Sequence, residues 1–218
     1  MCEVRYAVMV GLYRLCRQKS EMSSVFDNAD ARPDNRLMQL LGPDFFARDT
    51  LTVARELIGA VMVVGKCRCR LVETEAYTTD AASHSVTRRH KAALMRETFG
   101  HVYVYKIYGV HYCVNFTTER SGTGAVLIRA AEPLAGVPQM QARRGTTELK
   151  NLLRGPGRLC QALAIDLSLN GLPLGREIKL FAAQAICDVA SGPRIGVTQA
   201  AELEWRFFER GSPYVSRK

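Results

Sequence analysis

The chain has 218 residues, of which 30 are lysine or arginine and 21 are aspartate or glutamate, so its formal net charge is +9 at pH 7. An apolar content of 47% in a chain of this length favours a globular body with a buried core and excludes a wholly disordered protein. No stretch approaches the roughly eighteen consecutive apolar residues of a membrane helix, so we do not expect a membrane protein.

The first 36 residues differ from the rest. "MCEVRYAVMVGLYRLCRQ" holds a short apolar run between Glu3 and Arg14 without a small-residue cleavage site, so we interpret it as a nonessential extension, with a secretory signal as the alternative. Residues 18–36 are polar, mixed in charge and without periodicity. We therefore predict a disordered or poorly ordered extension over residues 1–36 and a folded domain over residues 37–218.

The charge and the cysteines restrict the partner and the compartment. Residues 1–37 carry six basic and five acidic side chains, so the body itself is basic, which favours a polyanionic partner. The odd, scattered set of seven cysteines contains no CxxC pair, which argues against a disulfide framework and a structural zinc site and favours a reducing compartment; these cysteines stand at positions 2, 16, 67, 69, 113, 160 and 187.

Regular structure is predicted from residue 37 onward. Asp49 or Thr50 could cap a helix over "TLTVARELIGA", which has one apolar face and Gly59 near its end. The next segment, "VMVVGKCRCRLVETEAY", is rich in valine and alternates with period two, as strands do, and "TTDAASHSVTRRHK" is typical of a loop.

The second half of the chain continues this mixture. "HVYVYKIYGVHYCVNFTTE" predicts two strands with a turn near Tyr108 and Gly109, and "GAVLIRAAEPLAG" predicts another strand. Helices are predicted at "GVPQMQARRG", "TELKNLLRG" and "GRLCQALAID", and short strands at "EIKLFAA" and "EWRFFERGSPYV". Strands before and after a helical middle indicate an α+β domain with a largely antiparallel sheet.

Two glutamates stand two residues apart in "RLVETEAY". On a strand, Glu73 and Glu75 would share one face with Leu71 and Tyr77, at a spacing of about 6–7 Å. Because unpaired buried carboxylates are costly, at least one should lie in a polar cleft. Composition alone favours surface or arginine-paired carboxylates, and the competing interpretation is a carboxylate tuned to activate water.

Five motifs in this order resemble the alkyladenine (3-methyladenine) DNA glycosylase family, the monofunctional class unrelated to helix-hairpin-helix glycosylases: "LVETEAYTTDAASH", "GHVYVYKIYGVHYCVN", "AVLIRAAEPLAG", "GPGRLCQALAID" and "RGSPYVS". The similarity covers roughly Leu37 to Ser216. The resemblance implies a single domain with a curved antiparallel sheet, surrounding helices and a protruding hairpin that inserts into DNA. It implies no cofactor or metal.

The resemblance assigns roles to individual residues. Glu75 matches the general base that activates water against the anomeric carbon of a flipped nucleotide, and Arg129 matches a residue that helps position that water. Residues matching the walls of the base pocket are Tyr77, His84, Tyr105 and Asn115, of which Asn115 limits purines that carry an exocyclic amino group. Tyr108 matches the side chain that fills the gap left by the extruded nucleotide, with Val110 beside it.

The resemblance further implies DNA repair by base excision on damaged duplex DNA, by a monomer that is cytoplasmic with the nucleoid in a bacterium or nuclear in a eukaryote, and not secreted. The candidates for phosphate contacts are Arg88, Arg89, Lys91 and Arg158, each of which could equally be an ordinary solvated basic residue. A non-catalytic nucleic-acid-binding module on the same scaffold is the alternative, and a nucleoside or RNA hydrolase is a third hypothesis.

Overall fold

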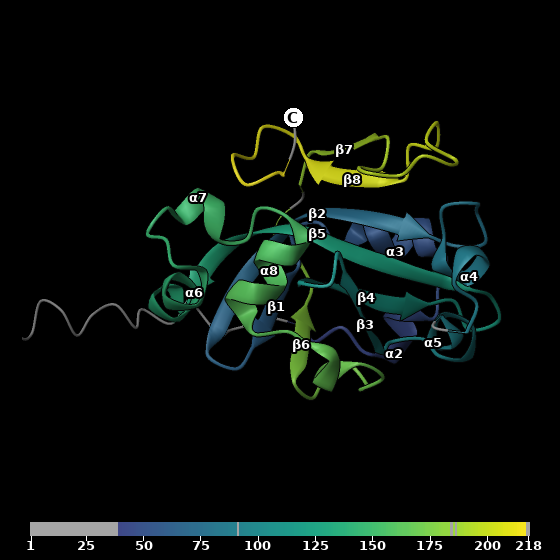
Figure 1. The fold of residues 1–218 in the computed structure, drawn as a ribbon, viewed down its shortest axis with the longest axis horizontal. Coiled ribbons are helices and arrows are strands. Elements are labelled where there is room, and N and C mark those ends of the chain that lie inside the picture. The colour runs from purple at the N-terminus through teal and green to yellow at the C-terminus, as the bar shows by residue number, and fades with distance from the viewer. Residues whose placement is uncertain (1–38, 91, 184, 186, 217–218) are drawn as a thin grey trace, which may run out of the picture. The chain divides into compact units, whose positions relative to one another are not determined.

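An antiparallel sheet organises the part of the chain that the computed structural model describes, namely residues 39–90, 92–183, 185 and 187–216 (Figure 1). The extension predicted over residues 1–36 lies outside these residues. The strands are β1 (Val61–Val64), β2 (Cys67–Tyr77), β3 (Val102–Ile107), β4 (His111–Thr118), β5 (Gly124–Ala135), β6 (Ile178–Phe181), β7 (Val189–Gly192) and β8 (Arg206–Glu209).

The long strand β2 is the centre of the sheet. The strand order is β3-β4-β5-β2-β1-β6, and β8 also pairs with β2 while β7 pairs with β8. One edge of β2 pairs with β5, whereas its other edge pairs first with β1 at 67–70 and then with β8 at 73–75. Because β1 and β8 succeed one another along the same edge of β2, the sheet divides there and curls instead of continuing flat (Figure 1).

Short helices surround the sheet: α2 (Pro43–Phe46), α3 (Thr50–Glu56), α4 (His84–Thr87), α5 (Ala93–Glu97), α6 (Val137–Arg144), α7 (Leu149–Leu152), α8 (Pro156–Leu163) and the 3-10 turn η2 (Leu167–Leu169). Helix α3 packs against β2, and α8 packs against β4 and β5. Across the described ranges, no helix is long and apolar enough to cross a membrane.

Helix α3 forms as its sequence predicts. The Asp49 side chain accepts a 2.8 Å hydrogen bond from the Thr52 amide, which satisfies one of the free donors of the first turn. After the helix the chain turns through Gly59, which has φ +88°, and a Cβ at this position would lie 2.6 Å from the Cys187 sulfur. Glycine is therefore required there by both conformation and space.

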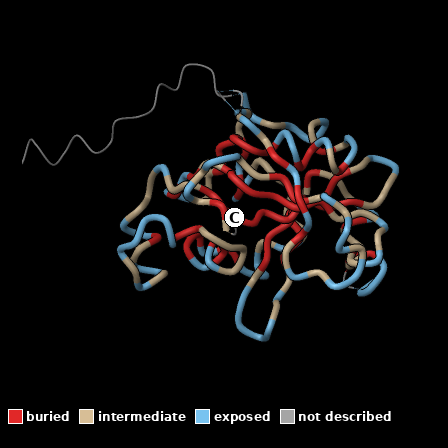
Figure 2. The backbone as a smooth tube through the Cα atoms, turned by 90° about the horizontal axis from the view of Figure 1, so that it is seen from above, coloured by how far each residue is buried: buried red, intermediate tan, exposed pale blue. Residues whose placement is uncertain are grey.

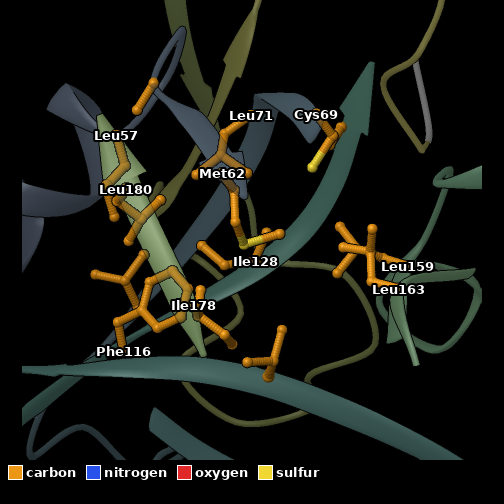
Figure 3. Close-up of a cluster of buried hydrophobic side chains, with 14 of the residues drawn as sticks. Leu57, Met62, Cys69, Leu71, Phe116, Ile128, Leu159, Leu163, Ile178 and Leu180 are labelled. Carbon is orange, nitrogen blue, oxygen red and sulfur yellow. The ribbon is translucent and has the colours of Figure 1, made fainter. Parts of the chain in front are cut away.

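The main core fills the space enclosed by α3, the curled sheet and α8 (Figure 3). Its largest members are completely or almost completely shielded from solvent, and they include Leu57, Met62, Leu71, Phe116, Ile128, Leu159 and Leu163. Figure 2 shows buried segments gathered at the centre and exposed loops around them. Because β2 and β5 both contribute to this core, polar side chains on their other face have a rigid support.

The α+β class and the antiparallel sheet are confirmed, and two local predictions are wrong. The bulge between Leu71 and Glu73 breaks the predicted alternation, so that Leu71 packs in the main core instead of sharing the face of the glutamates. The predicted loop contains the helical turn α4, which Ser83 caps by accepting a hydrogen bond from the Ser85 amide. Strand β7, where no strand was predicted, pairs with β8.

Candidate active site

A pocket with a volume of about 210 Å³ lies where β2, β3, β4 and β5 meet α4 and the loop 193–197. Its polar and aromatic lining comes from Tyr77, His84, Arg88, Tyr103, Tyr105, Asn115 and Arg129. Its apolar lining includes Met95, Ile107, Cys113, Ala125, Leu127 and Val197. The pocket therefore combines flat aromatic walls with a small number of polar groups, as sites for planar ligands do.

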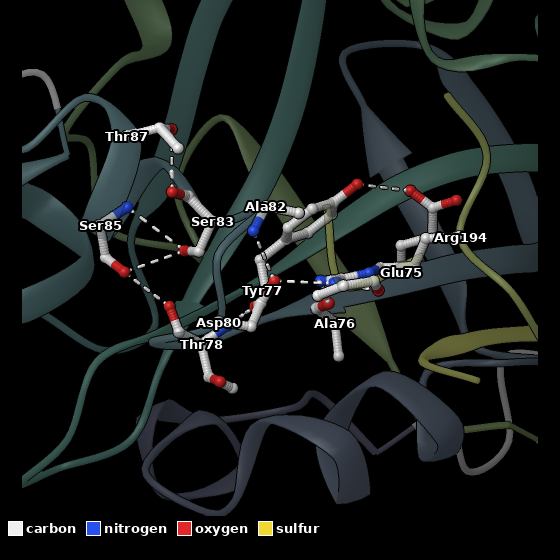
Figure 4. Close-up of polar contacts among 11 residues, drawn as sticks. Glu75, Ala76, Tyr77, Thr78, Asp80, Ala82, Ser83, Ser85, Thr87 and Arg194 are labelled. Carbon is white, nitrogen blue, oxygen red and sulfur yellow. Dashed lines mark hydrogen bonds and ion pairs between the residues drawn. The ribbon is translucent and has the colours of Figure 1, made fainter. Parts of the chain in front are cut away.

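Glu75 lies directly behind this pocket. Its carboxylate is fully buried and accepts hydrogen bonds from the Tyr77 hydroxyl at 2.8 Å, Arg129 Nη1 at 3.1 Å and the Ile195 amide at 2.7 Å. These three partners line the pocket, whereas Glu75 itself does not (Figure 4 shows the bond to Tyr77). Burial raises the pKa of Glu75 above its ordinary value, and the positive charge of Arg129 opposes that shift.

Glu73 is also fully buried, and its partners come from other elements. Its carboxylate accepts hydrogen bonds from Arg206 Nε on β8 at 2.7 Å, and from the Ser216 amide and hydroxyl at 2.6 and 2.9 Å. Arg129 Nε lies 3.4 Å from the same carboxylate. The two glutamates thus occupy different environments, one at the pocket and one against the C-terminal segment.

The pocket lining includes a packed cluster of three further rings. The His84 ring meets Tyr105 edge to face at 4.4 Å between ring centroids, and Tyr103 and Tyr105 lie 5.7 Å apart. His84 Nδ1 and the Tyr103 hydroxyl are 2.9 Å apart in a hydrogen bond. Burial, followed by the nearby charge of Arg88, lowers the pKa of His84 to about 4, so the imidazole is neutral at physiological pH.

Asn115 is buried on β4 and faces the same pocket. Its amide nitrogen donates a 3.0 Å hydrogen bond to the carbonyl of Tyr103 on the paired strand β3. This bond fixes the orientation of the side chain, so Asn115 presents a defined polar group to whatever occupies the pocket.

Arg194 holds the loop that completes the site. Its guanidinium lies 4.7 Å from the Tyr77 ring centroid and 5.2 Å from that of Trp205, and it donates a 2.7 Å hydrogen bond to Asp80 (Figure 4). Cation–π contacts of this kind are favourable in a buried setting. The next residue, Ile195, supplies the amide that reaches the buried carboxylate. Arg194 therefore fixes both an aromatic wall and a backbone donor.

The model of the family described as "Methylpurine-DNA glycosylase (MPG)" matches residues 44–213, which is most of the chain. The chain belongs to the methylpurine-DNA glycosylase family. The prediction of a DNA glycosylase, a hydrolase that acts on an N-glycosyl bond, is thereby confirmed.

Several curated relatives agree with the family match. A protein of Rhizobium johnstonii is 45% identical over 79% of this chain and 87% of its own length, and one of Agrobacterium fabrum is 46% identical over 80% and 91%. A protein of Methanoculleus marisnigri is 43% identical over 80% of this chain and 97% of its own length. Each of these relatives carries the name "Putative 3-methyladenine DNA glycosylase".

In this DNA glycosylase, strands β3 and β4 form a hairpin. The hairpin ends in an exposed tip made by Tyr108, Gly109 and Val110. Tyr108 and Val110 are 86% and 68% exposed, although both are large and apolar. Tyr108 and Gly109 have φ values of +52° and +70°, and the Val110 amide donates to the Ile107 carbonyl at 3.3 Å, which closes a tight turn. The predicted turn is confirmed, and it directs the tyrosine away from the core.

Three of the four basic residues proposed for DNA lie in the part of the chain that the structure describes. Arg88 lines the pocket, whereas Arg89 lines a separate open depression together with His90 and Arg96. Arg158 is exposed in the first turn of α8, and Lys91 lies outside the described residues.

The structure adds site residues that the sequence did not reveal. Ile195 acts through its backbone amide, which has no signature in the sequence. Tyr103 was visible as one of several tyrosines in a strand, and its hydrogen bonds to His84 and Asn115 distinguish it. Ser216 ends the C-terminal motif "RGSPYVS", whereas Arg206 precedes that motif on β8, and their shared contact with Glu73 depends on the fold.

Proposed function

We propose that the enzyme is a monofunctional DNA glycosylase of base excision repair that removes alkylated or deaminated purines of the 3-methyladenine, 7-methylguanine and hypoxanthine class from duplex DNA. Glu75 would activate the attacking water, and the product would be an abasic site. The observation that carries the proposal is the buried Glu75 carboxylate, whose three hydrogen-bond partners line an aromatic pocket.

Flipping the nucleotide is necessary because a glycosidic bond in stacked duplex is out of reach of a recessed carboxylate. Unstacking costs a few kcal/mol, and stacking of the flipped base on aromatic side chains returns about 1–3 kcal/mol. Tyr77 and the His84–Tyr105 pair, which all line the pocket, would supply such faces. A base methylated at N3 or N7 is cationic and is attracted to these electron-rich rings, and a neutral His84 does not repel it.

Hydrolysis follows from the position of Glu75. The attacking water would lie at the pocket floor, where Tyr77, Arg129 and Ile195 converge on the carboxylate. Glu75 takes a proton from this water, and the oxygen of the water forms a bond to C1′. The C1′–N9 bond breaks, and its electron pair leaves with the base. No lysine occurs among the described residues that line the pocket, which favours water over an amine as the nucleophile.

Selectivity is assigned to Asn115. Its amide is held against the Tyr103 carbonyl, so it cannot turn to accommodate every purine. The 2-amino group of guanine would meet this fixed side chain, whereas hypoxanthine and 3-methyladenine lack a 2-amino group. 7-Methylguanine carries one, and its cationic ring compensates because it weakens the glycosidic bond.

The hairpin tip and the basic residues would engage the DNA. We assign Tyr108 to the space vacated by the flipped nucleotide, with Val110 against the neighbouring bases, because both are exposed at a projecting turn. Arg88, Arg89, Lys91 and Arg158 are assigned to phosphates, which carry most of the affinity for duplex. The enzyme would act as a monomer on cellular DNA.

The test is a single-turnover excision panel on duplexes that each carry one lesion: 3-methyladenine, 7-methylguanine, ethenoadenine or hypoxanthine. The proposal expects abasic sites with at least one of these duplexes and none with the undamaged control. Tight duplex binding without abasic sites would instead identify a binding module, and cleavage of free nucleoside alone would identify a nucleoside hydrolase.

A further inference from the structure

The guanidinium of Arg129 lies between two buried carboxylates. Its Nη1 is 3.1 Å from Oε2 of Glu75, and its Nε is 3.4 Å from Oε1 of Glu73. Both glutamates are fully shielded from solvent, and Arg129 is 8% exposed. Because Arg129 Nε makes no hydrogen bond within the described part of the chain, Glu73 acts on the guanidinium through this ion pair, and Glu73 does not line the pocket.

Glu73 is itself anchored from outside the pocket. Arg206 Nε donates to it at 2.7 Å, and the Ser216 amide and hydroxyl donate at 2.6 and 2.9 Å. A buried carboxylate with several donors is fixed in orientation, because any rotation would leave a buried polar group unpaired. Glu73 is thus a rigid element of the site that cannot contact a base in the pocket.

The donor Ser216 is held by a C-terminal strap, defined here as residues 214–216. Val215 is buried in a small cluster with Val72 and Ala130, from β2 and β5. Arg154 Nε donates a 2.8 Å hydrogen bond to the Val215 carbonyl. The strap is therefore packed onto the strands that carry Glu73 and Arg129.

We propose that Glu73 is a positioning residue of the excision reaction. It links the C-terminal strap to Arg129 and holds the guanidinium in place beside the Glu75 carboxylate. This inference rests on the proposed function. Sharing Arg129 between two carboxylates also divides its positive charge, so Glu75 is stabilised less in its ionised form than by an arginine of its own.

The charge environment gives Glu73 a signature that a purely structural residue would lack. Glu73 and Glu75 lie among several other charged or titratable groups. These groups are Tyr77 on β2, Cys113 on β4, Arg129 on β5, Arg206 on β8 and Arg194 beside Tyr77. Neutralising Glu73 removes a negative charge that raises the pKa of Glu75. It also removes one of the two ion pairs of Arg129, so that Arg129 is then paired with Glu75 only. The pKa of Glu75 should then fall, and Glu75 should become a weaker base.

The experiment measures single-turnover excision against pH for the wild type, Glu73→Gln and Glu132→Gln, on one lesion duplex that the wild type cleaves. Glu132→Gln is the matched control, because Glu132 is paired with Arg70 at 2.8 Å elsewhere on the sheet. We expect Glu73→Gln to lower the rate at neutral pH about 10- to 100-fold and to move the acidic limb of the profile to lower pH. Glu132→Gln should match the wild type.

A Glu73→Gln rate within about twofold of the wild type, or a lower rate with the acidic limb unmoved, would overturn the inference. An inactive wild type on every lesion would instead overturn the proposed function. If Glu73→Gln does not fold, Ser216→Ala carries the test, because it removes one donor to Glu73. Its rate should fall about 3- to 10-fold with duplex binding unchanged, and Ser216→Thr should restore it. An unchanged Ser216→Ala rate would then reject the inference.

Discussion

The hydroxyl of Tyr77 donates a 2.8 Å hydrogen bond to Oε2 of Glu75, the residue two positions before it on β2. One side chain thus provides both an aromatic wall of the pocket and a donor to the buried carboxylate. This bond favours the ionised carboxylate and lowers the pKa of Glu75, against the larger rise that burial causes. Tyr77 therefore couples base binding to the protonation state of the proposed general base.

Replacing Tyr77 by phenylalanine keeps the ring and removes the donor. In the wild type, the hydrogen bond from Tyr77 lowers the pKa of Glu75. Without this bond the pKa of Glu75 should rise, and Glu75 should remain protonated to higher pH. The acidic limb of the single-turnover profile should move to higher pH, opposite to the direction expected for Glu73→Gln. Tyr77→Phe with an unmoved limb would show that the hydroxyl does not influence the base.

The exposed tyrosine of the hairpin tip gives a prediction that separates folding from DNA binding. Tyr108→Ala should change thermal stability little, by about 0.5 kcal/mol or less, because the side chain is 86% exposed. Affinity for a lesion duplex should fall about 10- to 100-fold, since an inserted ring stacks on neighbouring bases. Leu167→Ala is the control, because Leu167 is also large, apolar and 51% exposed. Loss of folding in Tyr108→Ala would contradict its assignment to the tip.

His84 should titrate far below an ordinary histidine. Burial and the charge of Arg88 lower its pKa from 6.5 to about 4. Between these values the unfolded chain binds a proton that the folded protein does not, so His84 makes the folded state less stable as pH falls through this window. NMR titration of the ring, assigned with His84→Gln, measures the pKa directly. Arg88→Gln should raise it, whereas a wild-type value near 6.5 would contradict the packed, neutral ring.

Phosphate contacts should appear in the salt dependence of duplex binding. If Arg158 contacts one phosphate, Arg158→Gln should reduce the slope of log affinity against log salt by about 0.9 and weaken damaged and undamaged duplexes alike. Arg176→Gln is the control, because Arg176 is an exposed arginine that does not line the pocket. Equal slopes for Arg158→Gln and the wild type would remove Arg158 from the interface.

The sequence predicted those parts of the molecule that depend on local pattern. The period-two alternation of "VMVVGKCRCRLVETEAY" predicted strand β2, and a cap at Asp49 or Thr50 predicted the start of α3. The ordered motifs also drew attention to Glu75, and the structure brings its carboxylate to within hydrogen-bonding distance of Arg129 from β5. Local patterns succeed here because strand pleat and helix capping act over a few residues.

The remaining features depend on distant parts of the chain. The bulge after Leu71 is set by pairing with β5, so no period-two rule could place Leu71 in the main core. The sequence could not predict that both glutamates are buried, because burial of Glu73 depends on its hydrogen bonds with Arg206 and Ser216, which lie far along the chain. The Ile195 amide reaches Glu75 across 120 residues, and a backbone group of this kind has no sequence signal.

The most direct measurement is single-turnover excision by Glu75→Gln on a lesion duplex that the wild type cleaves, with duplex affinity measured in parallel. The variant keeps the size of the side chain and removes its ability to take a proton from water. Base release should fall by at least about 100-fold while affinity for the lesion duplex is retained. Excision at the wild-type rate by a folded Glu75→Gln would remove Glu75 from the reaction and contradict the proposed mechanism.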